Sequence, residues 1–237
     1  MRLRCAGFNS LADAYLSYGD YSYVDPDLLV PGARTPALVR MIDGLQADVV
    51  GLQEAELPLV EALDETGTWQ SHWSPKGRNK PDGCLTLVRN GIDFSDQETH
   101  HYDDGSGHVV QTLRIGQAIF ANTHIRWAPA SDPEHAGVAQ TQELLDLLGP
   151  DTPAVVFTDC NDRPGGPVRK LFEASGFVNL HDEEPTAFVN KEPVSLDLLA
   201  VRGLHAEYIG TDFTAVEIPN RACPSDHIPK MAYVDVD

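Results

Sequence analysis

The hydrophobic positions of this chain form two kinds of pattern, short continuous runs and stripes at helical spacing. The continuous runs have the length and composition that favour buried strands, and they occupy residues 2–8, 48–53, 154–157, 195–201 and 228–236. Four further segments, with turn signals among them, favour successive strands of an antiparallel region at residues 83–89, 92–102, 108–115 and 117–123. The chain is therefore expected to be rich in strands.

Apolar residues at helical spacing predict helices between several of these strands. One begins with Thr35 as its N-cap, and a second follows Glu54. A third is expected to begin at Asp132, with Pro133 in its first turn, and a short fourth follows Pro167. Helices that alternate with strands in this way predict an α/β fold of packed sheets with helices outside.

Length and composition fit one soluble globular unit. The 237 residues are enough to bury a substantial core, and no repeat or linker divides them, so a single domain over residues 1–237 is expected. The chain is 42% hydrophobic and 22% charged, with no apolar run long enough to span a bilayer. No secretory signal precedes the first strand, so we expect a cytoplasmic protein that does not bind membranes.

The charge is strongly negative, with a formal net value of −19. Such a surface argues against an extended, non-specific grip on nucleic acid, which depends on Lys and Arg. It remains compatible with a small phosphate-bearing ligand held in a locally positive cleft beside a divalent cation. The best local basic patch is residues 74–81, which include Lys80. The four cysteines form no Cys-x-x-Cys pair, so they are expected to be reduced and mostly buried.

Polar residues recur where the apolar strands end. These residues are Asn9, Glu54, His124, Asp159, Asn161, Asp197, Asp226 and His227. The last two lie in a turn that Pro224 and Pro229 stiffen, because proline fixes φ and lacks an N–H. Strand ends at one edge of a sheet package converge, so we expect these side chains to lie together.

The chemistry of these side chains suits hydrolysis of a phosphoester. Oxygen ligands such as Glu54, Asn9 and Asp226 suit Mg²⁺ or Mn²⁺. His124 and Asn161 can help neutralise the phosphate charge. Either Asp159 or a His227–Asp197 pair can hold and activate the attacking water.

Each residue taken alone also has a structural interpretation. Glu54 suits the start of the following helix, because acidic side chains favour helix N-termini. His124 alone is typical of a hydrogen-bonded core histidine, and Asp197 can fix a turn. The joint occurrence of all eight residues favours the catalytic interpretation.

Seven segments, in order from end to end, resemble one known family. They are Phe8-Asn9-Ser10-Leu11-Ala12-Asp13, Leu52-Gln53-Glu54, Pro81-Asp82-Gly83-Cys84, Ala121-Asn122-Thr123-His124-Ile125-Arg126-Trp127, Thr158-Asp159-Cys160-Asn161, Leu196-Asp197-Leu198 and residues 219–229. The chain resembles the endonuclease/exonuclease/phosphatase superfamily, and within it the branch of carbon-catabolite-repressor-type deadenylases, nocturnin and 2′,5′-phosphodiesterases.

This resemblance implies a DNase I-like fold, in which a two-sheet β-sandwich is flanked by helices, with a Mg²⁺-dependent site at one edge. It implies that Glu54 is the principal metal ligand, with Asn9 and Asp226 near the metal. It further implies that Asp159 and Asn161 position the nucleophile and the phosphate, that His124 contacts the phosphate, and that His227 is a catalytic histidine oriented by Asp197.

Substrate-binding residues are also implied. Pro129 occupies the position at which the deadenylase branch packs a base, while Trp127, in the matching segment, and Lys80, in the basic patch, are further candidates. The sequence departs from the family at Thr158 and Cys160, where Gly and Phe are usual. It also departs at Glu192, where deadenylases carry a base-stacking Phe, so a stacking platform there would have to come from Phe188.

Three hypotheses follow from the sequence. The first is a Mg²⁺-dependent phosphodiesterase of the 3′-exonuclease type that acts on RNA ends or short oligonucleotides, as a single domain or within a larger RNA-processing protein. The second is a phosphomonoesterase that acts on a nucleotide or dinucleotide cofactor, and the third is a catalytically degenerate binding module. Products separate the first two, because inorganic phosphate indicates the second and nucleoside monophosphates the first.

Overall fold

Two sheets of six strands form the centre of the protein in a computed structural model that describes residues 1–129, 132 and 135–237. The first sheet has the strand order β13-β14-β1-β2-β4-β3. Its strands are β1 (Arg2–Asn9), β2 (Val49–Glu56), β3 (Trp69–Pro75), β4 (Asp82–Arg89), β13 (His205–Ile209) and β14 (Lys230–Asp235). Only the pair β1 and β2 is parallel in this sheet.

The second sheet has the order β5-β6-β7-β8-β12-β9. Its strands are β5 (Ser95–His101), β6 (Val109–Ile115), β7 (Ala118–His124), β8 (Ala154–Asp159), β9 (Val178–Asn179) and β12 (Asp197–Arg202). Here only β7 and β8 are parallel. A separate hairpin is formed by β10 (Ala187–Val189) and β11 (Glu192–Val194).

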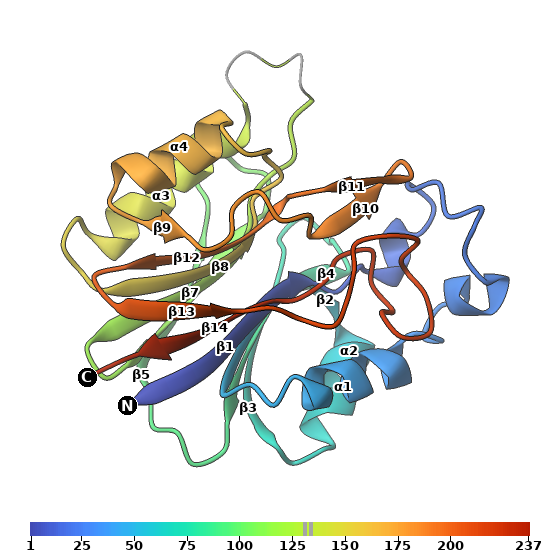
Figure 1. The fold of residues 1–237 in the computed structure, drawn as a ribbon, viewed down its shortest axis with the longest axis horizontal. Helices are drawn as coiled ribbons and strands as arrows, with labels where there is room; N and C mark the ends of the chain where they lie inside the picture. The colour runs from blue at the N-terminus through green and yellow to red at the C-terminus, as the bar shows by residue number, and fades with distance from the viewer. Residues whose placement is uncertain (130–131, 133–134) are drawn as a thin grey trace.

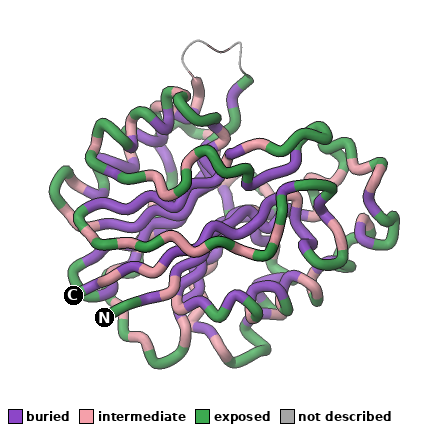
Figure 2. The backbone as a smooth tube through the Cα atoms, in the orientation of Figure 1, coloured by how far each residue is buried: buried purple, intermediate pink, exposed green. Residues whose placement is uncertain are grey.

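Helices cover the outer faces of the two sheets (Figure 1). The helices α1 (Thr35–Gly44) and α2 (Leu57–Asp64) pack on the first sheet, and α3 (Gly137–Leu148) and α4 (Pro167–Ala174) pack on the second. Two short 3₁₀ helices, η1 (Asp13–Tyr15) and η2 (Pro26–Leu29), lie between β1 and α1. In Figure 2 the strands are mainly buried and the outer turns mainly exposed. This arrangement confirms the expected α/β fold with two packed sheets.

A third core lies between the sheets, and close packing around Phe157 of β8 holds part of it together. A Cβ atom added to Gly51 of β2 would lie 2.6 Å from the Cβ atom of Phe157, and one added to Gly7 of β1 would lie 2.9 Å from its ring. Glycine is therefore required at both positions for the sheets to approach this closely. Phe157 precedes Asp159 by two residues and Gly7 precedes Asn9 by two, so this contact sets the spacing of the sheets beneath the strand ends.

Several sequence predictions need correction. Residues 83–89 do not continue into the antiparallel region, because β4 pairs with β2 and β3 on its two sides and leaves no free edge for β5. The strand β3 was not predicted. Arg34, not Thr35, is the N-cap of α1. The helix expected from Asp132 begins at Gly137, because His135 has a left-handed φ of 40°, and the predicted Pro133 lies outside the described residues.

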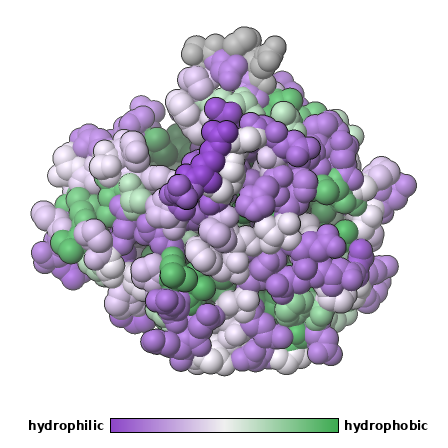
Figure 3. Space-filling model, turned by 180° about the vertical axis from the view of Figure 1, so that it is seen from behind, coloured by the Kyte–Doolittle hydropathy of each residue, from purple (hydrophilic) through white to green (hydrophobic). Residues whose placement is uncertain are grey.

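The surface agrees with the composition. Hydrophilic residues predominate on the face seen in Figure 3, and hydrophobic residues occur there in small separate groups. All four cysteines are buried and unpaired, as the sequence predicts. In the described part of the chain, no helix is both long and apolar enough to cross a membrane.

Candidate active site

Strand topology brings the predicted polar residues to one edge of the molecule. Asn9 pairs in register with Gln53, next to Glu54, because β1 and β2 are parallel. His124 pairs with Asp159 in the parallel β7–β8 ladder, and Asp197 pairs with the same Asp159 across the antiparallel β8–β12 ladder. Both sheets therefore contribute side chains at the same end of the sandwich.

Glu54 occupies an irregular position inside β2 instead of following its end. The register of β2 against β4 shifts between Leu52 and Ala55, and Glu54 has a left-handed φ of 55°. A non-glycine residue in this conformation costs about 1–2 kcal/mol, so local contacts must hold it. The Glu54 Oε1 atom accepts a hydrogen bond from Asn9 Nδ2 at 2.9 Å, and its Oε2 atom accepts one from the Ala12 amide at 3.0 Å.

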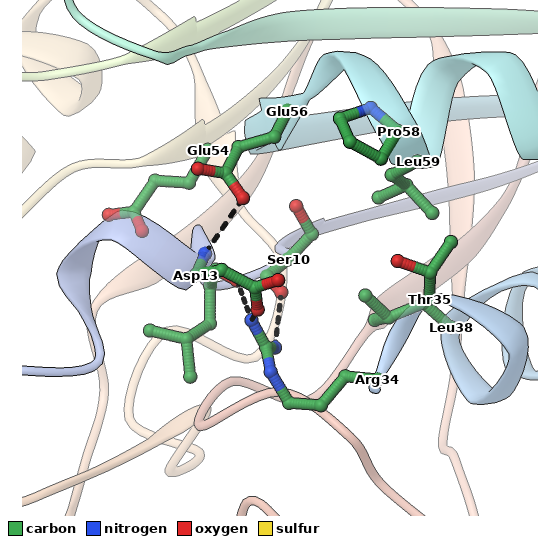
Figure 4. Close-up of a pocket in the computed structure, with 10 residues that line it drawn as sticks. Ser10, Asp13, Arg34, Thr35, Leu38, Glu54, Glu56, Pro58 and Leu59 are labelled. Atoms are coloured by element: carbon green, nitrogen blue, oxygen red, sulfur yellow. Dashed lines mark hydrogen bonds and ion pairs between the residues drawn. The ribbon is translucent and has the colours of Figure 1, made fainter. Parts of the chain in front are cut away.

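Glu54 and Glu56 both border the loop that follows β1 (Figure 4). Glu56 accepts a hydrogen bond from the Asp13 amide at 2.9 Å, and Arg34 forms an ion pair with the Asp13 carboxylate at 2.6 Å. The pocket among these side chains holds about 20 Å³, which is room for a water molecule but not for a nucleotide. It is therefore too small to be the substrate site, and the contacts to Asp13 hold the β1 loop.

Asp159 lies at the centre of the polar cluster. Its Oδ2 atom accepts a hydrogen bond from Asn9 Nδ2 at 3.0 Å and lies 3.6 Å from His124 Nε2 and 3.9 Å from His227 Nε2. Its Oδ1 atom accepts a hydrogen bond from the Asn161 amide at 3.0 Å. Asp159 is 2% exposed, so one buried carboxylate contacts four of the predicted site residues.

Asn161 reaches the cluster by a turn and not by strand alternation. The strand β8 ends at Asp159, and Asn161 has a left-handed φ of 50°, so the extended conformation stops before it. Its Nδ2 atom donates to the Ile125 carbonyl at 2.9 Å and lies 2.8 Å from His124 Nε2. The predicted Asp159–Asn161 pairing is present, although the backbone that produces it differs from the expectation.

His227 forms a pair with Asp197. The Nδ1 atom of His227 lies 2.7 Å from Oδ2 of Asp197, and both side chains are buried. The hydroxyl of Ser225 donates to the Asn9 carbonyl and accepts from the His227 amide, so it ties this turn to β1. Thr186 Oγ1 accepts hydrogen bonds from the Leu196 and Asp197 amides and thereby fixes the start of β12.

The two carboxylate oxygens of Asp226 differ in their contacts. Its Oδ2 atom accepts a hydrogen bond from the Tyr21 hydroxyl at 2.7 Å. Its Oδ1 atom is buried without a hydrogen-bond partner in the described structure and lies 4.0 Å from His227 Nε2. Leaving a buried carboxylate oxygen unpaired is costly, so this atom is suited to a ligand such as a cation.

Two lysine side chains lie near this acidic cluster. Lys76 is 4% exposed, forms an ion pair with Asp82 Oδ2 at 2.6 Å and lies 3.3 Å from His124 Nδ1. The Tyr15 hydroxyl donates to the other Asp82 oxygen at 2.6 Å. Lys80 is within electrostatic range of Lys76 and His124. Lys76 and Lys80 therefore bring positive charge to the acidic cluster in a protein of strongly negative net charge.

Burial and neighbouring charges shift the protonation of the cluster. Burial raises the pKa of Glu54 to about 7 and that of Asp159 to about 6. Burial, with Lys76 nearby, holds the pKa of His124 well below its ordinary value. Burial opposes a charge on His227, but the carboxylates of Asp197 and Asp159 outweigh it and raise the pKa of His227 well above its ordinary value. At neutral pH the site thus combines a neutral and a charged histidine.

The donor set fits a hard divalent cation. Glu54 and Asp226 bring carboxylate oxygens, one of them unpaired, and their negative charge raises the cost of the metal-free state. One potential ligand atom from each of Asp159, Asp197 and His227 also lies within 4.8 Å of the other two. Because Nδ1 of His227 is already bonded to Asp197, that second group is better suited to proton transfer than to metal binding.

The predicted substrate-binding residues are less buried than the polar cluster. Trp127 is 64% exposed, Pro129 is exposed, and Lys80 is half-buried. Phe188, by contrast, is 7% exposed and packs its ring edge-on against Tyr23, so it belongs to the core and offers no stacking surface. Glu192 is exposed on β11. Phe188 therefore does not replace the missing aromatic.

Sequence reasoning did not identify four residues that complete the site. Lys76 was not distinguished from the other basic residues of its loop, and the roles of Tyr15 and Arg34 were not foreseen. Tyr21 was not among the predicted site residues. The partners of Tyr15, Tyr21 and Arg34 are distant in sequence, by 205 residues for Tyr21 and Asp226, so no local signal reveals them.

Comparison with known proteins gives the family and the fold. A model described as the Endonuclease/Exonuclease/phosphatase family matches residues 19–228. The crystal structure of ANGEL2, a 2′,3′-cyclic phosphatase, in complex with adenosine-2′,3′-vanadate, is similar with a TM-score of 0.80 and 17% identity, covering 99% of this chain and 95% of that one. No curated protein matches.

Two further structures have the same fold. The human Nocturnin catalytic domain with bound sulfate has a TM-score of 0.72 at 17% identity, over 100% of this chain and 94% of that one. Truncated Caenorhabditis elegans TDP2 has a TM-score of 0.67 at 17% identity, over 99% of this chain and 98% of that one. At such low identities the similarity shows the fold and does not extend to substrates.

Proposed function

Because the chain belongs to the endonuclease/exonuclease/phosphatase family, we propose that it is a Mg²⁺-dependent phosphodiesterase acting on RNA ends or short oligonucleotides. The family consists of enzymes that hydrolyse phosphoester bonds, and this membership makes the chain a phosphoester hydrolase. The substrate class, the identity of the metal and the direction of attack on the substrate belong to the proposal. The cytoplasmic location and the single domain remain predictions.

The observation that carries the proposal is the convergence of side chains on Asp159. Its carboxylate contacts Asn9, Asn161, His124 and His227 within 4 Å. Burying so many polar groups at one strand end is costly, which favours a functional role for the cluster. Perturbed carboxyl and imidazole groups in such a cluster are typical of catalytic sites.

Each side chain has a proposed part in the reaction. Glu54, with Asn9 and Asp226, holds Mg²⁺, which when bound neutralises negative charge on the substrate phosphate. Asp159 accepts a hydrogen bond from the attacking water and orients it toward phosphorus, while the second carboxylate, Asp197, keeps His227 in place. The Asn161 amide and His124 make the remaining contacts to the phosphate. Lys76 lies beside Nδ1 of His124, on the other side of that ring.

The substrate proposal rests on the exposure of Trp127 and Lys80. The exposed Trp127 suits one stacked base and the half-buried Lys80 suits one phosphate, whereas the acidic Glu192 and the buried Phe188 leave the β10–β11 side without a stacking surface. This arrangement supports short or single-nucleotide ends over a poly(A) tract held between two platforms. The similarity to ANGEL2 makes an RNA end that carries a 2′,3′-cyclic phosphate a specific candidate, since this group is a phosphodiester.

The test is a product analysis on a panel of substrates. The purified protein with Mg²⁺ or Mn²⁺ is incubated with 3′-hydroxyl RNA, 2′,3′-cyclic phosphate RNA, 2′,5′-linked oligoadenylate, single-stranded DNA and NADP. Stepwise release of nucleoside monophosphates, or opening of the cyclic phosphate, would support the proposal. Loss of either reaction with EDTA would support metal dependence.

Variants connect any activity to the site. Glu54→Gln, Asp159→Asn and His227→Gln are each expected to abolish turnover while the protein stays folded. His205→Gln serves as a control, because that histidine is exposed on β13 and pairs only with Asp235 at the surface. Full activity in all three site variants would contradict the proposal.

The missing stacking surface also favours a second candidate function. A phosphomonoesterase acting on a nucleotide or dinucleotide cofactor needs fewer stacked bases than an exonuclease does. Release of inorganic phosphate from NADP alone would establish it. The third hypothesis, a degenerate binding module, would gain support only if every substrate on the panel remained intact.

A further inference from the structure

Tyr21 contacts Asp226 although no part of the reaction has been assigned to it. The phenol is protonated at neutral pH, so its hydroxyl donates to Oδ2 of Asp226, at 2.7 Å. The other oxygen, Oδ1, has no hydrogen-bond partner in the described structure. One oxygen of the carboxylate is thus held by protein, and the other is left available on the side of His227.

The segment that carries Tyr21 is held in place by the β10–β11 hairpin. At the hairpin turn, Lys191 forms an ion pair with Asp20 at 2.9 Å. Two residues after Tyr21, the ring of Tyr23 packs edge-on against Phe188 of β10, with centroids 5.5 Å apart. In Figure 1 the tip of this hairpin lies beside the segment that follows η1. Three neighbouring residues of one loop therefore have partners on folded elements.

The same hairpin also holds the backbone of Asp226. The Phe188 amide donates to the Asp226 carbonyl at 2.9 Å, and Ala187 forms an isolated bridge with His227. The hairpin therefore contacts the backbone of Asp226 and the segment carrying the phenol that binds its side chain. The backbone carbonyl of Asp226 and its side-chain Oδ2 atom are therefore both held by hydrogen bonds.

We propose that Tyr21 is a positioning residue that holds the Asp226 carboxylate with Oδ1 directed toward the divalent cation. The proposal rests on the function proposed above, because it assumes a cation bound by Glu54, Asn9 and Asp226. A hydrogen bond to the second oxygen of a ligating carboxylate restricts its rotation, and loss of such an outer contact typically lowers metal affinity 10–100-fold. A role in packing alone would lower stability without changing metal affinity.

The experiment compares Tyr21→Phe with the wild type by measuring Mn²⁺ binding through the paramagnetic resonance signal of the free ion. Thermal unfolding without metal is measured in parallel. Tyr21→Phe removes one oxygen atom and is expected to bind Mn²⁺ about 10–100-fold more weakly. Tyr18→Phe is the matched control, because the Tyr18 side chain is 82% exposed, and it is expected to bind Mn²⁺ as the wild type does.

A second variant covers the case in which Tyr21→Phe does not fold. Lys191→Met removes the ion pair to Asp20 at the surface, where both side chains are about half exposed, and is expected to weaken Mn²⁺ binding in the same direction. Wild-type Mn²⁺ affinity in a folded Tyr21→Phe protein would overturn the proposed role of Tyr21 and leave the proposed function standing. If Tyr21→Phe is unfolded, wild-type affinity in Lys191→Met would have the same meaning. A wild-type protein that binds no Mn²⁺ would overturn the proposed function and this role together.

Discussion

The Nδ1 atom of His227 lies 2.7 Å from Oδ2 of Asp197, so the two side chains, 30 residues apart, form a buried hydrogen-bonded pair. This contact fixes the ring so that Nε2 faces Oδ2 of Asp159, 3.9 Å away. The nitrogen that faces the site is determined by the bond that the other nitrogen makes. Asp197 thus controls His227 without itself reaching toward the substrate.

Replacing Asp197 by Asn should therefore impair catalysis through His227. The neutral amide of the Asp197→Asn variant lacks the negative charge that raises the pKa of His227, so this pKa should fall. Loss of a correctly protonated and oriented acid–base group typically lowers turnover 10²–10⁴-fold, and we expect a decrease in this range. Turnover and the NMR titration of the His227 ring check the prediction. Wild-type turnover together with an unshifted titration would show that the pair is only structural.

Replacing Glu54 by Gln should stabilise the metal-free protein at high pH. Burial raises the pKa of Glu54 from 4.5 to about 7, so between these values the folded state binds more protons than the unfolded state. The stability that this group contributes is complete below about pH 4.5 and is lost as the pH rises through about 7. Gln does not titrate and so avoids that loss.

The measured quantity is the difference in unfolding free energy between Glu54→Gln and the wild type, both without metal. It should shift in favour of the variant by on the order of 3 kcal/mol between pH 4.5 and pH 8. Glu98→Gln, on the exposed strand β5, is the matched control. A difference that does not change with pH would contradict the burial of the Glu54 charge.

Replacing Arg34 by Met should destabilise the whole site. The Arg34 guanidinium is buried, donates to the Pro224 carbonyl at 2.8 Å and pairs with Asp13 at 2.6 Å, so it joins the β1 loop to the turn that holds His227. Removing one member of a buried ion pair costs about 3–5 kcal/mol. Arg2→Met, which removes an exposed pair with Glu207, should cost about 1 kcal/mol or less. Equal losses in denaturant unfolding would contradict this assignment.

Replacing Trp127 by Ala should weaken substrate binding without loss of stability. Trp127 is 64% exposed, and stacking of a base on an aromatic ring is worth about 1–3 kcal/mol. The KM for an oligonucleotide should therefore rise, whereas the unfolding temperature should stay constant. Phe188→Ala should behave in the opposite way, because Phe188 is buried and its removal leaves a cavity. A Trp127→Ala protein with wild-type KM would exclude Trp127 as a stacking surface.

The sequence predicted the convergence of the polar side chains better than it predicted the strands that carry them. The convergence of Asn9, His124 and Asp159 was predictable, because these residues close apolar strands and parallel neighbours end at one edge. The position of β4 was not, because sheet partners are decided by packing between segments distant in sequence. The bulge at Glu54 likewise depends on its bonds to Asn9 and Ala12.

Residues that support the site were the hardest to predict. Lys76 is one of three basic residues in its loop. Its burial depends on its ion pair with Asp82 and on its contact with His124 from β7. The failure of Phe188 as a stacking residue has a similar cause, because Tyr23 from the N-terminal segment covers its ring. Both outcomes follow from tertiary contacts that a local pattern does not encode.

The most direct test of the central claim is the turnover of single-stranded RNA of defined 3′ end by the wild type and by Asp159→Asn, in Mg²⁺ and in EDTA. Asp159 contacts Asn9, Asn161, His124 and His227, so its charge lies beside four other predicted site residues. The account predicts turnover by the wild type in Mg²⁺, none in EDTA, and a loss of at least about 10²-fold in the folded variant. Equal turnover by the two proteins, or undiminished turnover in EDTA, would contradict it.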